Sequence, residues 1–247
     1  MREPYTRQPS PLDDREQSFL PLLAQVPMFR GLAPEPLLFL AGGCQLRSAA
    51  KGRVVCSKGH ELEGLFHLVE GRVKLAVLSE QGTERVIDIV LPGDSFGEAA
   101  AFLDRPVSTY AEALADSQLL FISRGRLREA VDRWSEVAHS VMRTLASRVQ
   151  KLTEDLEACC LHSAARRVAD FLLREAGSNG AAPDDTEVVL PAAKSVVASS
   201  LHLTPETFSR ELHSLARDGL IAIDSRRIRI LCADALRHRC GSASRVM

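Results

Sequence analysis

The chain has 247 residues, of which 45% are apolar and 26% charged, the balance of an ordinary globular protein. Lys and Arg number 31 against 32 Asp and Glu, and the net charge of −1 excludes a protein that binds polyanions over its whole surface. No run of about 18 apolar residues could span a bilayer. The polar N-terminus lacks the apolar core of a secretory signal. The sequence therefore predicts a cytoplasmic protein without a membrane contact.

The N-terminal region divides into a polar tail and a helical segment. Residues 1–17 are rich in Pro and charge, which predicts a flexible tail. Residues 18–48 show helical spacing, with Phe19, Leu22, Leu23 and Val26 among the apolar positions. We expect the first globular domain to begin at residue 18.

A compact β domain is predicted to follow. Short β-type runs alternate with turn residues rich in Gly, Pro and Asp. The runs are Arg53–Cys56, Leu65–Val69, Val73–Leu78, Arg85–Val90, Thr109–Leu114 and Gln118–Ile122. Many short strands at near-regular spacing indicate a sandwich or barrel, and we assign residues 18–125 to this domain.

A long apolar repeat predicts a helix of about 35 residues from Arg126 to about His162, far longer than a typical globular helix. Its apolar or small positions are separated by alternating steps of four and three, which is a heptad seam. They are Val131, Ser135, Ala138, Met142, Leu145, Val149, Leu152, Leu156 and Cys159. The seam favours a parallel coiled coil with a second copy, and the alternative is packing against the helix's own domain. We assign residues 126–160 to a dimerisation helix.

Six cysteines are present, and no Cys-x-x-Cys pair supports a zinc ribbon. They are Cys44, Cys56, Cys159, Cys160, Cys232 and Cys240. In a reducing compartment they are expected to be thiols. Because Cys159 continues the seam, an oxidation-sensitive Cys159-Cys160 pair is one hypothesis. The alternative is that Cys159 is a small apolar contact.

Residues 161–247 predict a helical domain with a β wing. From Pro191 onward, nine Lys and Arg stand against five Asp and Glu, a local excess of four positive charges. The expected elements are helices Ser163–Glu175, Ala192–Leu201 and Pro205–Arg217, a strand Val188–Leu190, and β runs Leu220–Ile223 and Arg227–Leu231. Thr204 can cap the last helix, and Pro205 suits its first position.

The helix over 205–217 has two distinct faces. The apolar face carries Phe208, Leu212 and Leu215. The opposite face carries Glu206, Ser209, Arg210 and His213. Arg can donate two hydrogen bonds to guanine, Glu can accept one from cytosine, and Ser can do either. Together with the basic wing, this pattern favours DNA reading over a merely solvated face. The predicted DNA-binding residues are Thr204, Pro205, Glu206, Thr207, Ser209, Arg210, His213 and Arg227.

From about Phe19 to Leu231, the chain resembles the CRP/FNR family of regulators. The resemblance is carried by the long helix and by VPMFRGL (26–32), LVEGRVKL (68–75), LPGDSFGEAAAFLDRP (91–106) and LTPETFSRELHSLARDGLI (203–221). It implies an α+β protein with a cyclic-nucleotide-binding-type β-roll (a jelly roll), a long dimerisation helix and a C-terminal winged helix-turn-helix. It also implies a homodimer on double-stranded DNA and contact with RNA polymerase. The sequence supplies no nucleophile–base pair or P-loop, so we do not expect an enzyme.

The resemblance also sharpens the DNA target. Members that read a TTGAT–N4–ATCAA palindrome carry E-x-x-S-R on the recognition helix, and Glu206, Ser209 and Arg210 match that motif. Segments 191–210 and 96–106 resemble the Dnr branch, which regulates denitrification.

For the effector, the resemblance locates a pocket that this sequence completes only in part. The candidate pocket residues are Gly97, Glu98, Val107, Ser108, Leu152 and Thr153. Val107 stands where cyclic-nucleotide binders have an Arg that holds the phosphate, which disfavours a cyclic nucleotide. Two alternatives stay open. One is a cyclic-nucleotide-responsive regulator of the same fold, and the other is a small-molecule-binding module that acts through protein partners.

The cofactor is left open. Residues 1–43 contain no cysteine, which disfavours the iron–sulfur cluster of the fumarate–nitrate regulators. The Dnr branch is associated with haem and nitric oxide, and His67 is a candidate axial ligand, although a lone His in a strand is commonly structural. We expect a redox, nitric oxide or haem signal rather than cyclic AMP.

Overall fold

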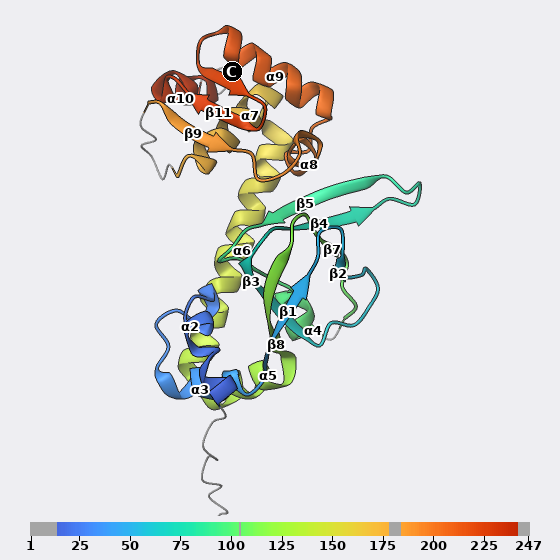
Figure 1. The fold of residues 1–247 in the computed structure, drawn as a ribbon, viewed down its shortest axis with the longest axis vertical. Coiled ribbons are helices and arrows are strands. Elements are labelled where there is room, and N and C mark those ends of the chain that lie inside the picture. Colours follow the sequence, from blue (N-terminus) through green and yellow to red (C-terminus); the bar gives the residue numbers. More distant parts are fainter. Residues whose placement is uncertain (1–13, 104, 178–183, 242–247) are drawn as a thin grey trace, which may run out of the picture. The chain divides into compact units, whose positions relative to one another are not determined.

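A computed structural model describes residues 14–103, 105–177 and 184–241 (Figure 1). The chain divides into two compact units. The first unit contains the residues up to Leu75 together with Val90–Ser147, and the second contains Ala76–Ile89 and the residues from Arg148 onward. This division between the units cuts through a pair of strands and through a long helix. It does not test the predicted domain boundaries at residues 125 and 160, which stay predictions.

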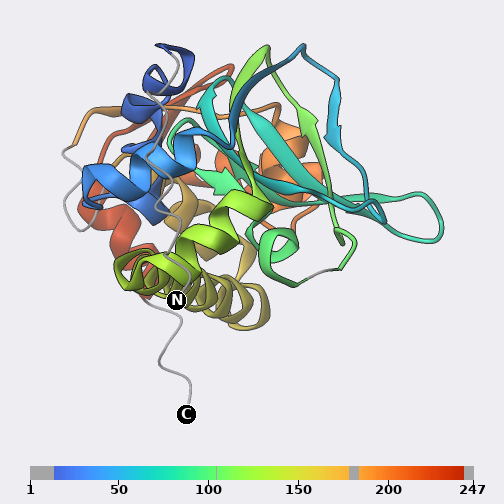
Figure 2. The same ribbon diagram turned by 90° about the horizontal axis from the view of Figure 1, so that it is seen from below.

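Short helices begin the first unit. They are α1 (Asp14–Gln17), α2 (Leu20–Leu23), the 3-10 helix η1 (Pro27–Phe29) and α3 (Pro34–Ala41). Residues 14–17, predicted as part of a flexible tail, are therefore helical, and residues 1–13 lie outside the described part of the chain. Figure 2 shows these helices (blue) beside α5 (Arg124–Arg133), with which α3 is in contact.

The helical prediction for residues 18–48 is wrong at its end. After α3, Gly42 and Gly43 interrupt the helix, and Cys44–Ala49 forms strand β1. A Cβ at Gly43 would lie 2.5 Å from Arg126 Cγ, so this close approach requires glycine. Strand β1 pairs antiparallel with β8 (Ser117–Ser123) along its whole length. Pairing with a strand so distant in the sequence overrides the local helical pattern.

Two four-stranded sheets form the predicted β-roll. One has the order β1-β8-β3-β6, with β3 at Gly64–Glu70 and β6 at Ser95–Phe96. The other has the order β2-β7-β4-β5, with β2 at Val54–Cys56, β7 at Tyr110–Ala113, β4 at Val73–Leu78 and β5 at Glu84–Val90. Side chains from both sheets fill one core, in which the Phe66 ring lies 5.3 Å from the rings of both Phe96 and Phe121. A short helix, α4 (Glu98–Leu103), follows β6.

The predicted long helix is broken in two. Helix α5 ends at Arg133, and α6 (Ser135–Leu161) begins after an extended Trp134 with φ −126° and ψ 113°. The indole ring packs 5.2 Å from the Phe39 ring, and the Arg133 guanidinium lies 4.7 Å above it. This tertiary packing accounts for the break, which shortens the uninterrupted helix to 27 residues.

The second unit contains the winged module. Its elements are α7 (Ala164–Glu175), β9 (Thr186–Val189), α8 (Lys194–Ser200), α9 (Pro205–Arg217), β10 (Ile221–Asp224), β11 (Arg227–Ile230) and α10 (Ala233–Gly241). The strands form an antiparallel sheet in the order β10-β11-β9. Every predicted element is present, and α9 has the predicted bounds. Helix α10 was not predicted.

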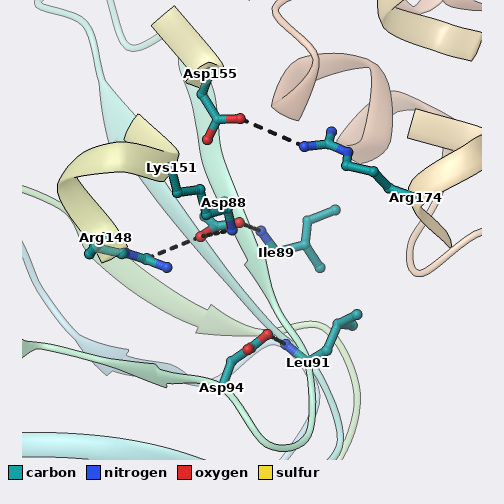
Figure 3. Close-up of polar contacts among 8 residues, drawn as sticks. All are labelled: Asp88, Ile89, Leu91, Asp94, Arg148, Lys151, Asp155 and Arg174. Atoms are coloured by element: carbon teal, nitrogen blue, oxygen red, sulfur yellow. Dashed lines mark hydrogen bonds and ion pairs between the residues drawn. The ribbon is translucent and has the colours of Figure 1, made fainter. Parts of the chain in front are cut away.

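Polar contacts link the hairpin 76–89 to the helices of the second unit (Figure 3). Asp88 Oδ2 lies 3.1 Å from Arg148 Nη2 and 3.7 Å from Lys151 Nζ on α6. Further along α6, Asp155 Oδ1 lies 3.7 Å from Arg174 Nη1 on α7. These ion pairs connect the second half of α6 to its neighbours in the same unit.

Candidate DNA-binding interface

Local signals in the sequence define the start of α9. The Thr204 hydroxyl accepts a hydrogen bond from the Thr207 N–H at 3.2 Å, and Pro205 occupies the first turn. The backbone N–H of Glu206 and the Thr204 side chain hydrogen-bond the Glu206 carboxylate, which lowers the pKa of Glu206 below its ordinary value. The carboxylate is therefore ionised at neutral pH and can act only as an acceptor.

The two predicted faces of α9 are observed. Phe208, Leu212 and Leu215 are buried in the core of the second unit. Glu206, Arg210 and His213 are exposed, and Ser209 is half-buried between them. The Arg210 side chain is 70% exposed and lies 3.5 Å from the Glu211 carboxylate, a weak surface contact that leaves its donors available. The His213 Nδ1–H donates to the Ser209 carbonyl at 2.7 Å, which fixes the imidazole against the helix.

The three basic residues of the wing are all exposed, but one of them is tied to the backbone. Arg226 Nη2 donates to the Leu190 carbonyl at 2.8 Å and so ties the wing to the segment after β9. Arg227 Nη1 lies 2.9 Å from Glu187 Oε1, and Arg229 Nε lies 4.0 Å from Asp185 Oδ1. Exposed pairs of this kind contribute about 0–1 kcal/mol, so a phosphate can replace the acidic partner. Arg227 and Arg229 are thus candidates for phosphate contacts.

Sequence reasoning missed one residue of this interface. Arg167 on α7 donates from Nη1 to the carbonyls of Leu201 and His202 in the turn between α8 and α9. The adjacent arginines 166 and 167 at the edge of an apolar helix face were the available signal. Their pattern does not show which carbonyl either one reaches.

The predicted effector residues belong to different elements, four of them in the first unit and two in the second. Gly97 has φ +92°, and a Cβ there would lie 2.9 Å from Leu62 Cδ2, so glycine is required by the backbone. Val107 lines a hollow of about 590 Å³ on the β-roll, with Arg53, His60 and Leu62 among its neighbours. Glu98 begins α4, and Ser108 is exposed. Leu152 and Thr153 are exposed residues of α6 in the second unit.

His67, the candidate haem ligand, lies enclosed in the β-roll. Its side chain is 1% exposed on β3, and Nδ1 hydrogen-bonds the Ser95 hydroxyl at 3.1 Å. Burial lowers the pKa of His67, partly offset by the nearby Asp94 carboxylate. The enclosed imidazole thus has one ring nitrogen engaged with Ser95, and its role as a haem ligand stays a prediction.

Two family models match the chain in separate stretches. Residues 46–133 match a cyclic nucleotide-binding domain, and residues 166–239 match a Crp-like helix-turn-helix domain. The transcriptional regulator LdrP of Thermus thermophilus is 31% identical over 202 residues, which cover 80% of this chain and 98% of the relative. The chain belongs to the CRP/FNR family of transcriptional regulators.

A further relative and a solved structure agree with this fold. The Cyclic AMP receptor protein of Thermus thermophilus is 28% identical over 197 residues, covering 80% of this chain and 88% of that protein. The structure of FixK2 from Bradyrhizobium japonicum superimposes with a TM-score of 0.70 at 23% identity, covering 79% of this chain and 96% of that one. The predicted fold is therefore confirmed, and the relatives are transcriptional regulators rather than enzymes.

An apolar stripe runs along α6 of this CRP/FNR protein. Met142, Val149, Leu152 and Leu156 are each between 54% and 64% exposed in the single chain, and Cys159 continues the stripe. Ala138 and Leu145 are half-buried, because this first part of the helix packs against the first unit. The exposed stripe thus starts at Met142, one turn before Leu145, and continues along the helix beyond that core. No described helix is both long and apolar enough to cross a membrane.

Proposed function

We propose that this CRP/FNR protein is a homodimeric regulator that reads a TTGAT–N4–ATCAA palindrome in double-stranded DNA. The observation that carries the proposal is the outer face of α9, where Glu206, Ser209 and Arg210 lie together while the opposite face is buried. Residues on such a face, near the start of the helix, reach base edges in the major groove. The function places the protein with DNA in the cytoplasm, and contact with RNA polymerase is part of the proposal.

In the proposed interface, different residues determine the DNA sequence that is recognised and the affinity. Arg210 donates to guanine, and the ionised Glu206 accepts from cytosine. The DNA backbone is approached by four further residues, which are Thr204, Pro205, Thr207 and His213. Arg227 contacts a phosphate. Phosphate contacts fix the register of the helix, whereas base contacts determine the sequence that is read.

The apolar stripe of α6 supports a parallel dimer. Four large apolar side chains exposed along one helix are unfavourable in water, and a second copy of the same stripe would cover them. Two parallel helices would place their recognition helices about one DNA turn apart, roughly 34 Å, which a palindrome requires.

For the signal, the residues favour a trigger other than a cyclic nucleotide. Val107 offers no charge to a cyclic phosphate at the position where the family's binders carry Arg, although a relative is named a cyclic AMP receptor protein. Thiol oxidation at Cys159 is a trigger that the described residues can support, since the side chain is exposed on the stripe. Two thiols would each lose a proton and an electron to a peroxide and form a disulfide. The proposal of a Dnr-type regulator with a nitric oxide signal rests on the resemblance of segments 96–106 and 191–210 to that branch.

DNA binding is tested by titrating reduced, ligand-free protein into a fluorescent TTGAT–N4–ATCAA duplex and following anisotropy. A TGTGA palindrome is the control. Preference for the first duplex supports the assignment of α9. Absence of binding to any duplex, with and without cyclic AMP, would contradict it and favour a module that acts through protein partners.

The dimer is tested with the native cysteines. Oxidation should give a disulfide-linked dimer in the parent protein and in Cys160→Ser, which leaves the stripe intact. The dimer should be absent from Cys159→Ser. A linked dimer that depends on Cys160 would place the wrong face of α6 at the axis. Loss of the oxidant's effect on DNA affinity in Cys159→Ser would support the redox signal.

A further inference from the structure

The turn between α8 and α9 is built from groups on three helices. Helix α8 ends at Ser200, and the next two carbonyls, of Leu201 and His202, lie beyond its last turn, where a helix leaves acceptors without partners. Arg167 of α7 supplies the donor, with a single nitrogen, Nη1, at 2.8 Å from the Leu201 oxygen and 3.2 Å from the His202 oxygen. A guanidinium at the C-terminal end of α8 is also favoured by the helix dipole.

The backbone of this turn depends on such support. His202 has φ +55°, in the left-handed region that residues other than glycine rarely adopt. The Leu203 N–H then returns to the Ala198 carbonyl at 2.9 Å, and Thr204 caps α9 directly afterwards. The direction in which α9 leaves the turn is therefore set within three residues, two of which present their carbonyls to Arg167.

Arg167 is itself held firmly. Its neighbours on α7, Val168 and Leu172, are fully buried, which anchors the helix in the core of the second unit. Its Nε–H is buried and has no partner among the described residues. A buried donor without a partner is costly, and the two bonds made by Nη1 give a reason for its retention.

We propose that Arg167 is a positioning residue for DNA recognition, which fixes the angle of α9 by bridging the carbonyls of Leu201 and His202. This inference rests on the proposed function of α9. In this proposal Arg167 acts through the turn, where Nη1 serves two backbone acceptors, and not by touching DNA. The positions of Glu206 and Arg210 relative to the bases follow from the angle that the turn imposes.

The experiment compares Arg167→Gln with Arg167→Lys and with Arg174→Gln. Arg174 is exposed on the same helix and pairs only loosely with Asp155, so its substitution removes the same charge without touching the turn (Figure 3). Anisotropy measures affinity for the TTGAT–N4–ATCAA duplex and for a scrambled duplex. Amide hydrogen exchange at Leu203 reports on the turn directly.

Arg167→Gln should lower affinity for the palindrome about tenfold, the effect of losing hydrogen bonds from a charged donor, while affinity for the scrambled duplex changes no more than in Arg174→Gln. Leu203 exchange should accelerate in Arg167→Gln only. Because one nitrogen makes both contacts, Arg167→Lys should recover part of the lost preference.

An equal loss of affinity for both duplexes would mean that Arg167 contributes only its charge, and it would overturn the proposal. Unchanged Leu203 exchange in Arg167→Gln would overturn it as well. If the parent protein prefers neither duplex, the proposed function fails, and the Leu203 exchange still decides whether Arg167 holds the turn.

Discussion

On the recognition helix α9, Glu206, Arg210 and His213 lie in solvent, whereas in the β-roll His67 and Gly97 are fixed by the fold. Arg210 is 70% exposed, and its contact with Glu211 is weak. His67, by contrast, is enclosed beside Ser95, and Gly97 is fixed by its backbone. A rigid helix can therefore present a reading face, while the roll keeps the family's architecture.

This contrast has a physical basis in what each task requires. Base reading needs hydrogen-bond donors and acceptors on a surface whose position is fixed by the core beneath it. The buried Phe208 and Leu212 provide that support. A small-molecule site needs an enclosed cavity with a few convergent polar groups. The hollow lined by Val107 has Arg53 and His60 in its lining, but Val107 itself, at the position where the family's binders carry Arg, offers no charge to a phosphate.

The largest effect is expected on the stability of the second unit, measured apart from that of the first. Phe208→Ala removes a fully buried ring from the core under α9 and should destabilise the second unit by about 3–5 kcal/mol. Trp134, the single tryptophan, packs on Phe39 in the first unit, so its fluorescence reports on that unit alone. In urea, circular dichroism should show an early transition that Trp134 fluorescence does not follow. Coincident transitions would show that the units unfold as one.

A smaller effect is expected from the roll. Gly97→Ala forces a Cβ to 2.9 Å from Leu62 at a positive φ and should cost about 1–3 kcal/mol, measured by Trp134 fluorescence. Gly125→Ala is the matched control, because Gly125 lies in α5 with its nearest neighbour at 3.8 Å, and Ala favours a helix. Equal stabilities of the two variants would show that Gly97 is not needed by the backbone.

On the DNA side, Arg210→Ala should cost about 1–3 kcal/mol of discrimination at one base pair. Arg217→Ala, at the other end of the same helix, removes the same charge and should weaken binding to all duplexes alike. Anisotropy with single-base variants of the palindrome measures both. An unchanged order of preference in Arg210→Ala would remove Arg210 from the reading face.

Sequence reasoning performed best where structure is determined locally. Helix α9 has the predicted bounds because Thr204, Pro205 and the Asp218-Gly219 pair act within a few residues of their own positions. The apolar period also placed Phe208, Leu212 and Leu215 in the core. The exposed side of the same helix followed from this period without any knowledge of the rest of the fold.

It failed where distant segments decide the outcome. Strand β1 depends on pairing with β8, and the break at Trp134 depends on Phe39. The bridging contacts of Arg167 depend on where α7 crosses the turn after α8, which no spacing along the chain reveals. The enclosure of His67 likewise follows from the strand on which it lies and from Ser95 on β6.

The smallest effect is a pH dependence confined to the roll. Burial lowers the pKa of His67 in the folded protein below its ordinary value of 6.5. The unfolded chain then binds the proton more readily than the folded one, so the stability of the roll is fully present above about pH 6.5 and falls as the pH drops further. Denaturation followed by Trp134 fluorescence between pH 7.5 and 5 should show this loss, and His67→Gln, which keeps a polar side chain without a titration, should reduce it. A loss of stability that persists unaltered in His67→Gln would assign the pH dependence to other groups and remove the distinction drawn here between an enclosed roll and an exposed reading face.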